Sequence, residues 1–417
     1  MSIFKTISYA DTGSLDSFSR LRTSTPEILF SVQNQYNAVP ALMENGATGT
    51  GTAATWQSNS RMVLLTATAG TGTSFTQSYQ YSPYQPGLSQ FIALTGVLGA
   101  GTANVTKDFG YFDANNGVIF RQNGTTNLQL ILRTSTSGSV SDANIFAQSA
   151  WNIDTLNGSG GITNPSGITL DVTKSFILII DLQFLGMGRV RVGFDINGII
   201  YYVHQFLNAN FLTGPYMQTA TLPIQALLTA TSSASPASCY FKCATVQSEG
   251  GNINFYGQTF STPDISVTAG NNTRTALLAI RPRTTFNGIS NRALFQLQNI
   301  SILNTGNQAI RWELMVGVTY SVAPTYSNVD TNGSAFEYSS ATGTYGSGGT
   351  VISSGYMSNA TNGAGVIELG GLSHLNYPIT LDRSGAVRSD GTLSLIVTGI
   401  GGTSNAVRAT FDYTEIK

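Results

Sequence analysis

Few residues in this sequence could perform catalysis or hold a metal ion. The 417 residues include two histidines, two cysteines and 21 carboxylates scattered along the chain. An enzyme needs acids, bases, nucleophiles or metals gathered at one place, and zinc needs closely spaced histidine or cysteine ligands. His204 and His374 lie far from each other and from the cysteines. We therefore expect no catalytic residue, metal site or cofactor, although a hydrolase with paired carboxylates, for example Asp181 and Asp195, stays open.

The two thiols and the central histidine are expected to have structural roles. Cys239 and Cys243 lie in the segment CYFKC, and on a β-strand both side chains would project from one face about 13 Å apart. That separation is too large for a disulfide, so both should be free thiols. His204 could be a pH-sensitive or ligand-facing group. We expect it instead to be a hydrogen-bonded strand residue opposite Arg191.

Two glycine-containing segments have residue types that also occur in ion-binding loops. The segment DANNG, which begins at Asp113, could offer carboxylate and amide oxygens to calcium. A turn between two strands explains the same residues, and no closing acidic residue follows at the spacing of a calcium-binding loop. The segment GMGRVRVG contains a Gly-x-Gly, but no phosphate-binding helix follows it. Both segments therefore indicate turns, and the sequence leaves calcium binding at Asp113 undecided.

The elements that must position these side chains are predicted to be strands. Only 10% of the residues are charged and 45 are glycine, which favours strands and turns over helices. Short apolar runs alternate with Gly, Asn and Ser clusters, as in a β-sandwich or jelly roll. The length exceeds what one core usually supports. We expect an extended N-terminal arm and linker at residues 1–60, a β-sandwich body at 61–255 and a second all-β domain, a C-terminal β-sandwich, at 256–417.

The clearest local prediction is a β-hairpin in the segment RVRVGFDINGIIYYVHQF. Asn197 and Gly198 predict a two-residue type I′ turn, which fixes the register of the two strands. One face of the hairpin should be apolar and look into the core, with the opposed pairs Ile196 and Ile199, Phe194 and Tyr201, and Val192 and Val203. The other face is mixed and suggests an interface. Its residues are Arg189, Arg191, Asp195, Ile200, Tyr202, His204 and Phe206.

Charge and hydropathy narrow the partners. The formal net charge is −1 and there is no basic block, so nucleic acid is an unexpected partner. The most apolar segment, SFILIIDLQFL, is short and interrupted by Asp181, and the opening residues lack a signal-peptide pattern. We therefore expect that the chain does not span a membrane. We also expect that it folds in a reducing cytoplasm. A surface this poor in charge favours coverage by other subunits, and hence a homo-oligomer.

The opening segment DSFSRLRTSTPEILF and two longer stretches, residues 81–124 and 151–210, resemble a family of virion structural proteins of tailed bacteriophages, many from marine and environmental phages. Members commonly begin with D-x-F-G-R-L-R-V-S-x-P-x-T-L-F. Ser19, Thr23 and Ile28 replace the usual Gly, Val and Thr of that pattern. The resemblance covers roughly residues 11–255. The matching positions are Asp16, Phe18, Arg20, Leu21, Arg22, Ser24, Pro26, Leu29 and Phe30.

The resemblance implies a non-enzymatic structural component of a phage particle, with no catalytic residue or cofactor to carry over. The body is similar to concanavalin-like or laminin-G-like sandwiches. A head- or tail-attached decoration, collar or fibre protein would contact capsid, portal or tail subunits, and a trimer is expected by analogy. The protein would reside in the virion after assembly in the host bacterial cytoplasm.

The opening segment suits an arm that lies across a neighbouring subunit, because Pro26 disfavours a helix and polar and apolar anchors alternate. The alternative is an arm folded back on its own sandwich. The candidate interface residues are Phe18, Arg20, Leu21, Arg22, Leu29 and Phe30 of the arm and Arg189, Arg191, Tyr202 and His204 of the hairpin.

Two other functions remain open from the sequence. The first is a receptor-binding fibre or spike module that recognises host cell-surface glycan through aromatic residues such as Tyr201, Tyr202 or Tyr256. The second is a polysaccharide depolymerase, which would need carboxylates grouped in a groove.

Overall fold

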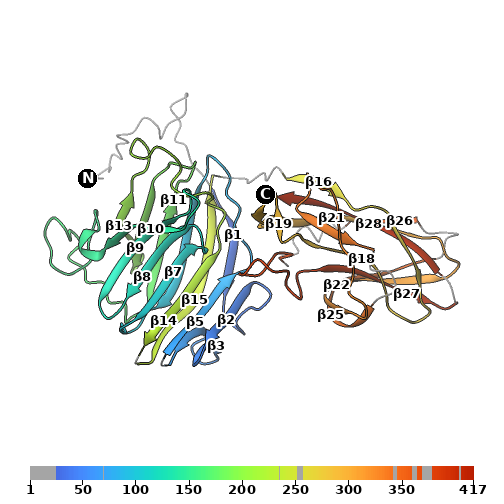
Figure 1. The fold of residues 1–417 in the computed structure, drawn as a ribbon, viewed down its shortest axis with the longest axis horizontal. Helices are drawn as coiled ribbons and strands as arrows, with labels where there is room; N and C mark the ends of the chain where they lie inside the picture. Colours follow the sequence, from blue (N-terminus) through green and yellow to red (C-terminus); the bar gives the residue numbers. More distant parts are fainter. Residues whose placement is uncertain are drawn as a thin grey trace, which may run out of the picture.

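The computed structural model describes residues 25–68, 70–233, 235–250, 257–340, 345–358, 364–368, 378–402 and 405–417. These residues form β-strands and one short 3-10 helix, η2 (Gln148–Ala150). Figure 1 shows two sandwiches side by side along the long axis of the molecule. The predicted all-β sandwich fold is therefore confirmed. Among the described segments there is no helix with the length and apolar character needed to cross a membrane.

The first sandwich, called the body here, packs an eight-stranded sheet on a seven-stranded one. The larger sheet contains β1 (Pro26–Gln33), β3 (Thr52–Gln57), β4 (Met62–Ala67), β6 (Ser89–Val97), β11 (Phe176–Leu182), β12 (Val190–Ile196), β13 (Ile199–Phe206) and β15 (Ala237–Glu249). The smaller sheet contains β2 (Met43–Gly49), β5 (Gly70–Ser78), β7 (Val105–Phe112), β8 (Gly117–Asn123), β9 (Asn127–Thr134), β10 (Ser141–Ala147) and β14 (Ile224–Ser233). The orders are β13-β12-β11-β6-β15-β4-β3, with β1 beside β15, and β10-β9-β8-β7-β14-β5-β2.

The second sandwich uses the strands after residue 257. Its five-stranded sheet contains β16 (Gln258–Ser261), β17 (Ile265–Ala269), β21 (Leu294–Asn304), β26 (Ala364–Glu368) and β28 (Asn405–Ile416). Its six-stranded sheet, in the order β23-β24-β18-β27-β22-β25, contains β18 (Thr275–Pro282), β22 (Ala309–Tyr320), β23 (Ser327–Asn328), β24 (Phe336–Ser339), β25 (Tyr345–Met357) and β27 (Leu393–Ile400). A two-stranded ribbon adds β19 (Thr285–Phe286) and β20 (Ile289–Ser290). The expected domain boundary after residue 255 lies outside the described residues.

Each sandwich has its own aromatic core. In the body, the ring of Phe120 meets those of Phe194 and Phe176 edge-on, with centroids 5.0 and 5.7 Å apart. In the second sandwich, Tyr413 packs 4.9 Å from Phe295. Edge-to-face and offset pairs use the ring quadrupole as well as buried area, so they favour one arrangement of the core.

Residues 26–57 belong to the body, which corrects the expected arm and linker at residues 1–60. β1 pairs antiparallel with β15, from Pro26 opposite Glu249 to Gln33 opposite Cys243, while β2 and β3 pair with β5 and β4. The alternation of apolar side chains in β1 places Phe30 and Val32 in the core, each only 5% exposed. A backbone that pairs along its whole length and buries one face is a sheet strand.

The pairing of β1 with β15 also places two of the expected arm residues. Phe30 is a core residue of its own sandwich, and Leu29 packs against the same core. The backbone oxygen of Leu29 accepts a hydrogen bond from the Gln80 side chain at 3.0 Å. Both side chains therefore pack against their own sandwich and do not lie on an extended arm. Phe18, Arg20, Leu21 and Arg22 lie outside the described residues.

The hairpin forms as predicted at its tip and departs from the prediction further along. Asn197 and Gly198 both have positive φ, 56° and 84°, as a type I′ turn requires. Ile196 opposes Ile199 as predicted, but a β-bulge between Val192 and Gly193 then shifts the register. The bulge places Val192 opposite His204, and the side chains beyond it change faces.

A second β-bulge separates the two thiols. It lies in β15 between Phe241 and Cys243, where the pairing with β6 shifts. Cys239 is buried in the core, whereas Cys243 is only half-buried. The prediction of a shared face is wrong because it assumed an unbroken two-residue alternation. Both thiols are free, as predicted. Burial raises the pKa of the Cys239 thiol to about 12.

The pairing of β1 predicts the outcome of two truncations. A chain that begins at Thr25 keeps every described strand and is the reference for the comparison. A chain that begins at Asn34 removes β1 and with it Phe30 and Val32. Since losing a buried Phe side chain alone costs about 3–5 kcal/mol, the free energy of unfolding of the body should fall by at least about 3 kcal/mol in urea titrations. Equal midpoints for the two truncated chains would contradict this.

Candidate functional site

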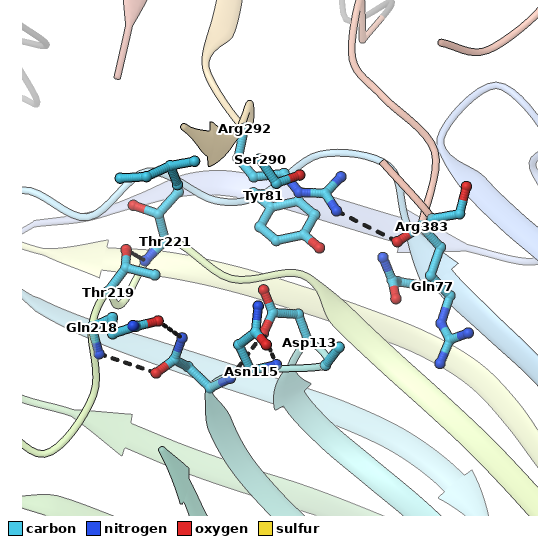
Figure 2. Close-up of a pocket in the computed structure, with 14 residues that line it drawn as sticks. Gln77, Tyr81, Asp113, Asn115, Gln218, Thr219, Thr221, Ser290, Arg292 and Arg383 are labelled. Atoms are coloured by element: carbon cyan, nitrogen blue, oxygen red, sulfur yellow. Dashed lines mark hydrogen bonds between the residues drawn. The ribbon is translucent and has the colours of Figure 1, made fainter. Parts of the chain in front are cut away.

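A cleft of about 500 Å³ lies where the two sandwiches meet (Figure 2). The body lines it with the segment that ends β5, the turn between β7 and β8, and the loop before β14. The second sandwich lines it with the segment after β19 and the loop before β27. Ligand sites occur preferentially at such domain interfaces. The polar side chains that line the cleft include Tyr81, Asp113, Asn115, Gln218, Thr219, Arg292 and Arg383.

The floor of the cleft is the turn formed by the segment DANNG. One oxygen of the Asp113 carboxylate accepts the backbone N–H groups of Asn115 and Asn116 at 2.7 and 2.9 Å, which is an Asx turn. The Asn116 side chain exchanges two hydrogen bonds with Gln218, at 3.0 and 3.2 Å. Gln218 also accepts a hydrogen bond from the Ser135 hydroxyl at 2.7 Å. The turn interpretation is confirmed, and the turn is held rigidly against the loop before β14.

The described part of the chain offers no set of acidic ligands for the calcium site considered at Asp113. There, no three His, Cys, Asp or Glu side chains are grouped so that they could hold a metal ion. Asp113 contributes one oxygen to the turn itself. Its neighbours in the cleft are amides, hydroxyls and guanidinium groups.

The roof of the cleft includes Arg292, which is held in place from two sides. Its two terminal nitrogens donate to the backbone oxygens of Asp382 and Arg383 at 2.9 and 3.4 Å, the second shown in Figure 2. Its guanidinium lies 4.3 Å from the centre of the Tyr81 ring. Burial raises the pKa of the Tyr81 phenol, so this hydroxyl stays protonated at physiological pH.

Arg383 forms a second contact between the sandwiches. Its guanidinium lies 4.5 Å from the centre of the Phe75 ring, and its backbone N–H donates to the Glu44 carboxylate at 2.7 Å. With the Gln225 amide oriented so that its oxygen faces Arg383, that oxygen accepts two further hydrogen bonds at 3.0 and 3.2 Å. Burial lowers the pKa of Arg383 and raises that of Glu44, and the charges of these two groups partly offset both shifts.

Three arginines of the second sandwich thus lie over three rings of one body segment. Stacking of a guanidinium on an aromatic face is worth about 0.5–2 kcal/mol, more when the pair is shielded from water. Together the contacts fix the second sandwich against the end of β5. The pairs are Arg383 on Phe75, Arg388 on Tyr79 at 3.4 Å, and Arg292 on Tyr81.

The charge balance in the cleft is incomplete. Among the described residues, the ion pairs within 4 Å do not involve Arg292 or Arg383. Arg388, outside the cleft, pairs with Asp390 at 2.8 Å. The cleft is therefore lined by two arginines that form no carboxylate ion pair within 4 Å among the described residues, although Glu44 partly offsets the charge of Arg383.

The hairpin residues expected at an interface lie elsewhere and form two separate groups. Arg191 forms an ion pair with Asp181 and lies 4.2 Å from the centre of the Tyr202 ring, whose hydroxyl donates to the same carboxylate at 3.2 Å. Arg189 is exposed on its own. The structure brings Arg191 and Tyr202 together on the outer face of the larger body sheet, and leaves His204 apart from them.

His204 is buried, with 2% exposure, because the hairpin bulge turns it toward the core. Its ring centroid lies 4.5 and 4.7 Å from those of Phe146 and Phe206. Its Nδ1 accepts the backbone N–H of Asn152 at 3.2 Å. The prediction of a hydrogen-bonded strand histidine is confirmed, but its partner across the strands is Val192. Burial lowers the pKa of His204 to about 4.

The carboxylates proposed for a hydrolase have other tasks. Asp181 pairs with Arg191, and one oxygen of Asp195 accepts the Gly198 N–H at 2.8 Å to close the hairpin turn. On the smaller body sheet, Asp108 and Asp142 form ion pairs with arginines, and the hydrogen bond from Arg133 lowers the pKa of Asp142.

The cleft residues of the second sandwich were missed by the sequence reading. Arg292 and Arg383 stand alone in the sequence, with no motif around them. Their partners are set by contacts between segments more than 200 residues apart, for example Tyr81 with Arg292. The one local signal was the aromatic alternation in SFTQSYQYSPY, which was read only as a strand.

Solved structures that resemble the chain are distant in sequence. The CBM2 module of the evolved Dit of Lactobacillus casei BL23 phage J-1 is 8% identical, with a TM-score of 0.33 over 56% of this chain and 100% of that one. The β-glucanase of Bacillus licheniformis is 11% identical, with a TM-score of 0.30 over 56% and 100%. Lectin I-B4 from Griffonia simplicifolia is 10% identical, with a TM-score of 0.31 over 54% and 100%. No protein-family model and no curated protein matches the chain.

The lowered pKa of His204 predicts an acid-sensitive body. Between about pH 6.5 and 4 the unfolded chain binds a proton at this histidine and the folded chain does not, so stability should fall as the pH falls through this range. One pKa unit corresponds to about 1.4 kcal/mol, so the loss from this residue is at most about 3 kcal/mol.

The His204→Asn variant isolates this effect, because an amide oxygen can accept the Asn152 N–H without titrating. Urea titrations at several pH values should give a free energy of unfolding that falls less steeply toward acid for the variant than for the natural chain. Parallel pH profiles would show that His204 is protonated equally well in both states.

The stacking of Arg388 on Tyr79 predicts a measurable coupling between the sandwiches. In a double-mutant cycle with Arg388→Met and Tyr79→Leu, followed by differential scanning calorimetry, the interaction energy should be about 1–2 kcal/mol. Tyr79→Phe keeps the ring face and should behave like the natural chain. Additive effects of the two substitutions would contradict the coupling.

Proposed function

We propose that this protein is a non-enzymatic structural component of a bacteriophage virion, a head- or tail-attached decoration, collar or fibre protein. The observation that carries the proposal is that its few charged side chains hold the structure together. Asp108 binds Arg121 through two hydrogen bonds of 2.7 Å, and Glu313 binds Arg274 through two of 2.8 Å. Carboxylates tied to guanidinium groups in this way are poor general acids or bases.

The joint between the sandwiches supports the same proposal. A component that spans subunits of a particle must keep its parts in a fixed relation, and three arginine–ring contacts with the Glu44 hydrogen bond do so here. The phage-like pattern of residues 16–30 adds support from the sequence. Its partners would be capsid, portal or tail subunits, and the protein would be a homo-oligomer, a trimer by analogy. It would assemble in the host bacterial cytoplasm and reside in the virion.

On this proposal the opening segment docks through the residues before β1. β1 forms part of the body sheet, so the contact with other virion proteins falls to the residues before Pro26, among them Phe18, Arg20, Leu21 and Arg22.

A second candidate function is the recognition of host cell-surface glycan. The interdomain cleft favours it, because sugar hydroxyls are bound by amide, hydroxyl and carboxylate groups such as those of Asn115, Thr219 and Asp113. This function is compatible with a place in the virion.

The particle itself tests the first proposal. In cryo-electron microscopy of purified phage, density for both sandwiches should be found on the particle at symmetric positions. Absence of the chain from purified particles would refute the proposed function. A protein that begins at Thr25 should fold normally but no longer join particles in a complementation assay with the full-length chain as control. Normal incorporation of the truncated protein would refute docking through the opening segment alone.

A further inference from the structure

The cleft between the sandwiches has a chemistry more specific than general sugar binding. We propose that it binds a saccharide that carries a carboxylate, with the acid group held by Arg292 and Arg383 and the hydroxyls held by the turn at Asp113. This inference rests on the second candidate function above and names its ligand class.

Arg292 is prepared to receive an anion. A guanidinium has five N–H donors in a plane, and Arg292 uses one terminal nitrogen for each of two backbone oxygens. These bonds and the Tyr81 ring fix the orientation of the group, so little side-chain entropy is lost on binding. Its remaining donors are unused by any carboxylate of the described residues.

Arg383 gives the same wall of the cleft a second positive charge. Burial already lowers its pKa, which means that its charged form lacks part of its stabilisation by water. Glu44, the carboxylate nearest to it, contacts the backbone N–H of Arg383 and has a raised pKa of its own. The Arg383 guanidinium lies over Phe75 and donates to the Gln225 oxygen. Arg383 would therefore attract a ligand carboxylate by its charge, while Arg292 would supply the charge-assisted hydrogen bonds.

The opposite wall selects hydroxyls and disfavours multiply charged anions. Asp113 uses one carboxylate oxygen for its own turn, and its negative charge faces the same cleft. A phosphate dianion would be repelled there, whereas a sugar hydroxyl can donate to a carboxylate. Asn115 and Thr219 add amide and hydroxyl groups beside it, as Figure 2 shows. The volume of about 500 Å³ lies in the usual range for a small-ligand site.

Titration calorimetry on the full-length protein tests the inference with paired probes. The acidic probes are trigalacturonate and sialyllactose, which distinguish a uronate from a sialate source. The neutral counterparts are the methyl esters of trigalacturonate and of sialyllactose, which keep every sugar ring and remove only the charge. We expect saturable binding of at least one acidic probe and affinity at least about tenfold lower for its neutral counterpart, since hydrogen bonds to charged groups contribute the larger share.

Three variants locate the site. Arg292→Gln and Arg383→Gln should each lower the affinity for the acidic probe by about tenfold or more. Arg388→Gln is the matched control, because it removes an arginine from the same interface but does not line the cleft, and it should bind as the natural protein does. Thermal unfolding of each variant verifies that both sandwiches remain folded.

Three results would overturn the inference. Equal binding of acidic and neutral probes would remove the carboxylate from the proposal and leave sugar binding standing. Equal losses for all three variants would assign the effect to the joint between the sandwiches. No saturable binding of any probe would refute both the acidic ligand and the glycan function, while the place in the virion would still be decided by the particle experiment.

Discussion

The stacking of three arginines on three aromatic rings is the interaction that holds the two sandwiches in a fixed relative position. All three rings come from the body, at the end of β5 and just after it, so a single short segment sets the position of the second sandwich. The geometry of the cleft depends on this stacking, because Arg292 and Arg383 both contact the body rings and line the cleft. A ligand in the cleft would touch residues of both sandwiches, and its binding would therefore be linked to their relative position.

Sequence patterns predicted the elements well where local chemistry decides the backbone. Asn197 and Gly198 predicted their turn because only that turn type needs positive φ at both residues. Two of the errors come from β-bulges, each of which inserts a residue without a signal in composition. Bulges account for the changed face of His204 and for the separated thiols. Residues 26–57 were assigned to an arm and linker because β2, with its two glycines, and β3, with its small residues, lack the apolar alternation by which strands are recognised.

The candidate site was less predictable than the fold. DANNG was correctly read as a turn, yet nothing local showed that this turn would face two arginines from the second sandwich. Arginines that stack on aromatic rings show no periodic spacing in the sequence. The aromatic residues that they contact resemble ordinary strand residues. Several of the described arginines nevertheless have a defined ring or carboxylate partner, for example Arg388 with Tyr79 and Asp390.

The pairing of Pro26 with Glu249 has a mechanical consequence. The body sheet begins and ends at neighbouring points, so the chain enters and leaves the body at the same end. A pulling force applied between the residues before Pro26 and the second sandwich would separate β1 from β15 at that end, one hydrogen-bonded pair after another. Such loading opens a sheet at low force. The arginine–ring contacts join the second sandwich to the other sheet of the body at β5 and the segment that follows it, so part of the load would pass to that sheet and not to β1.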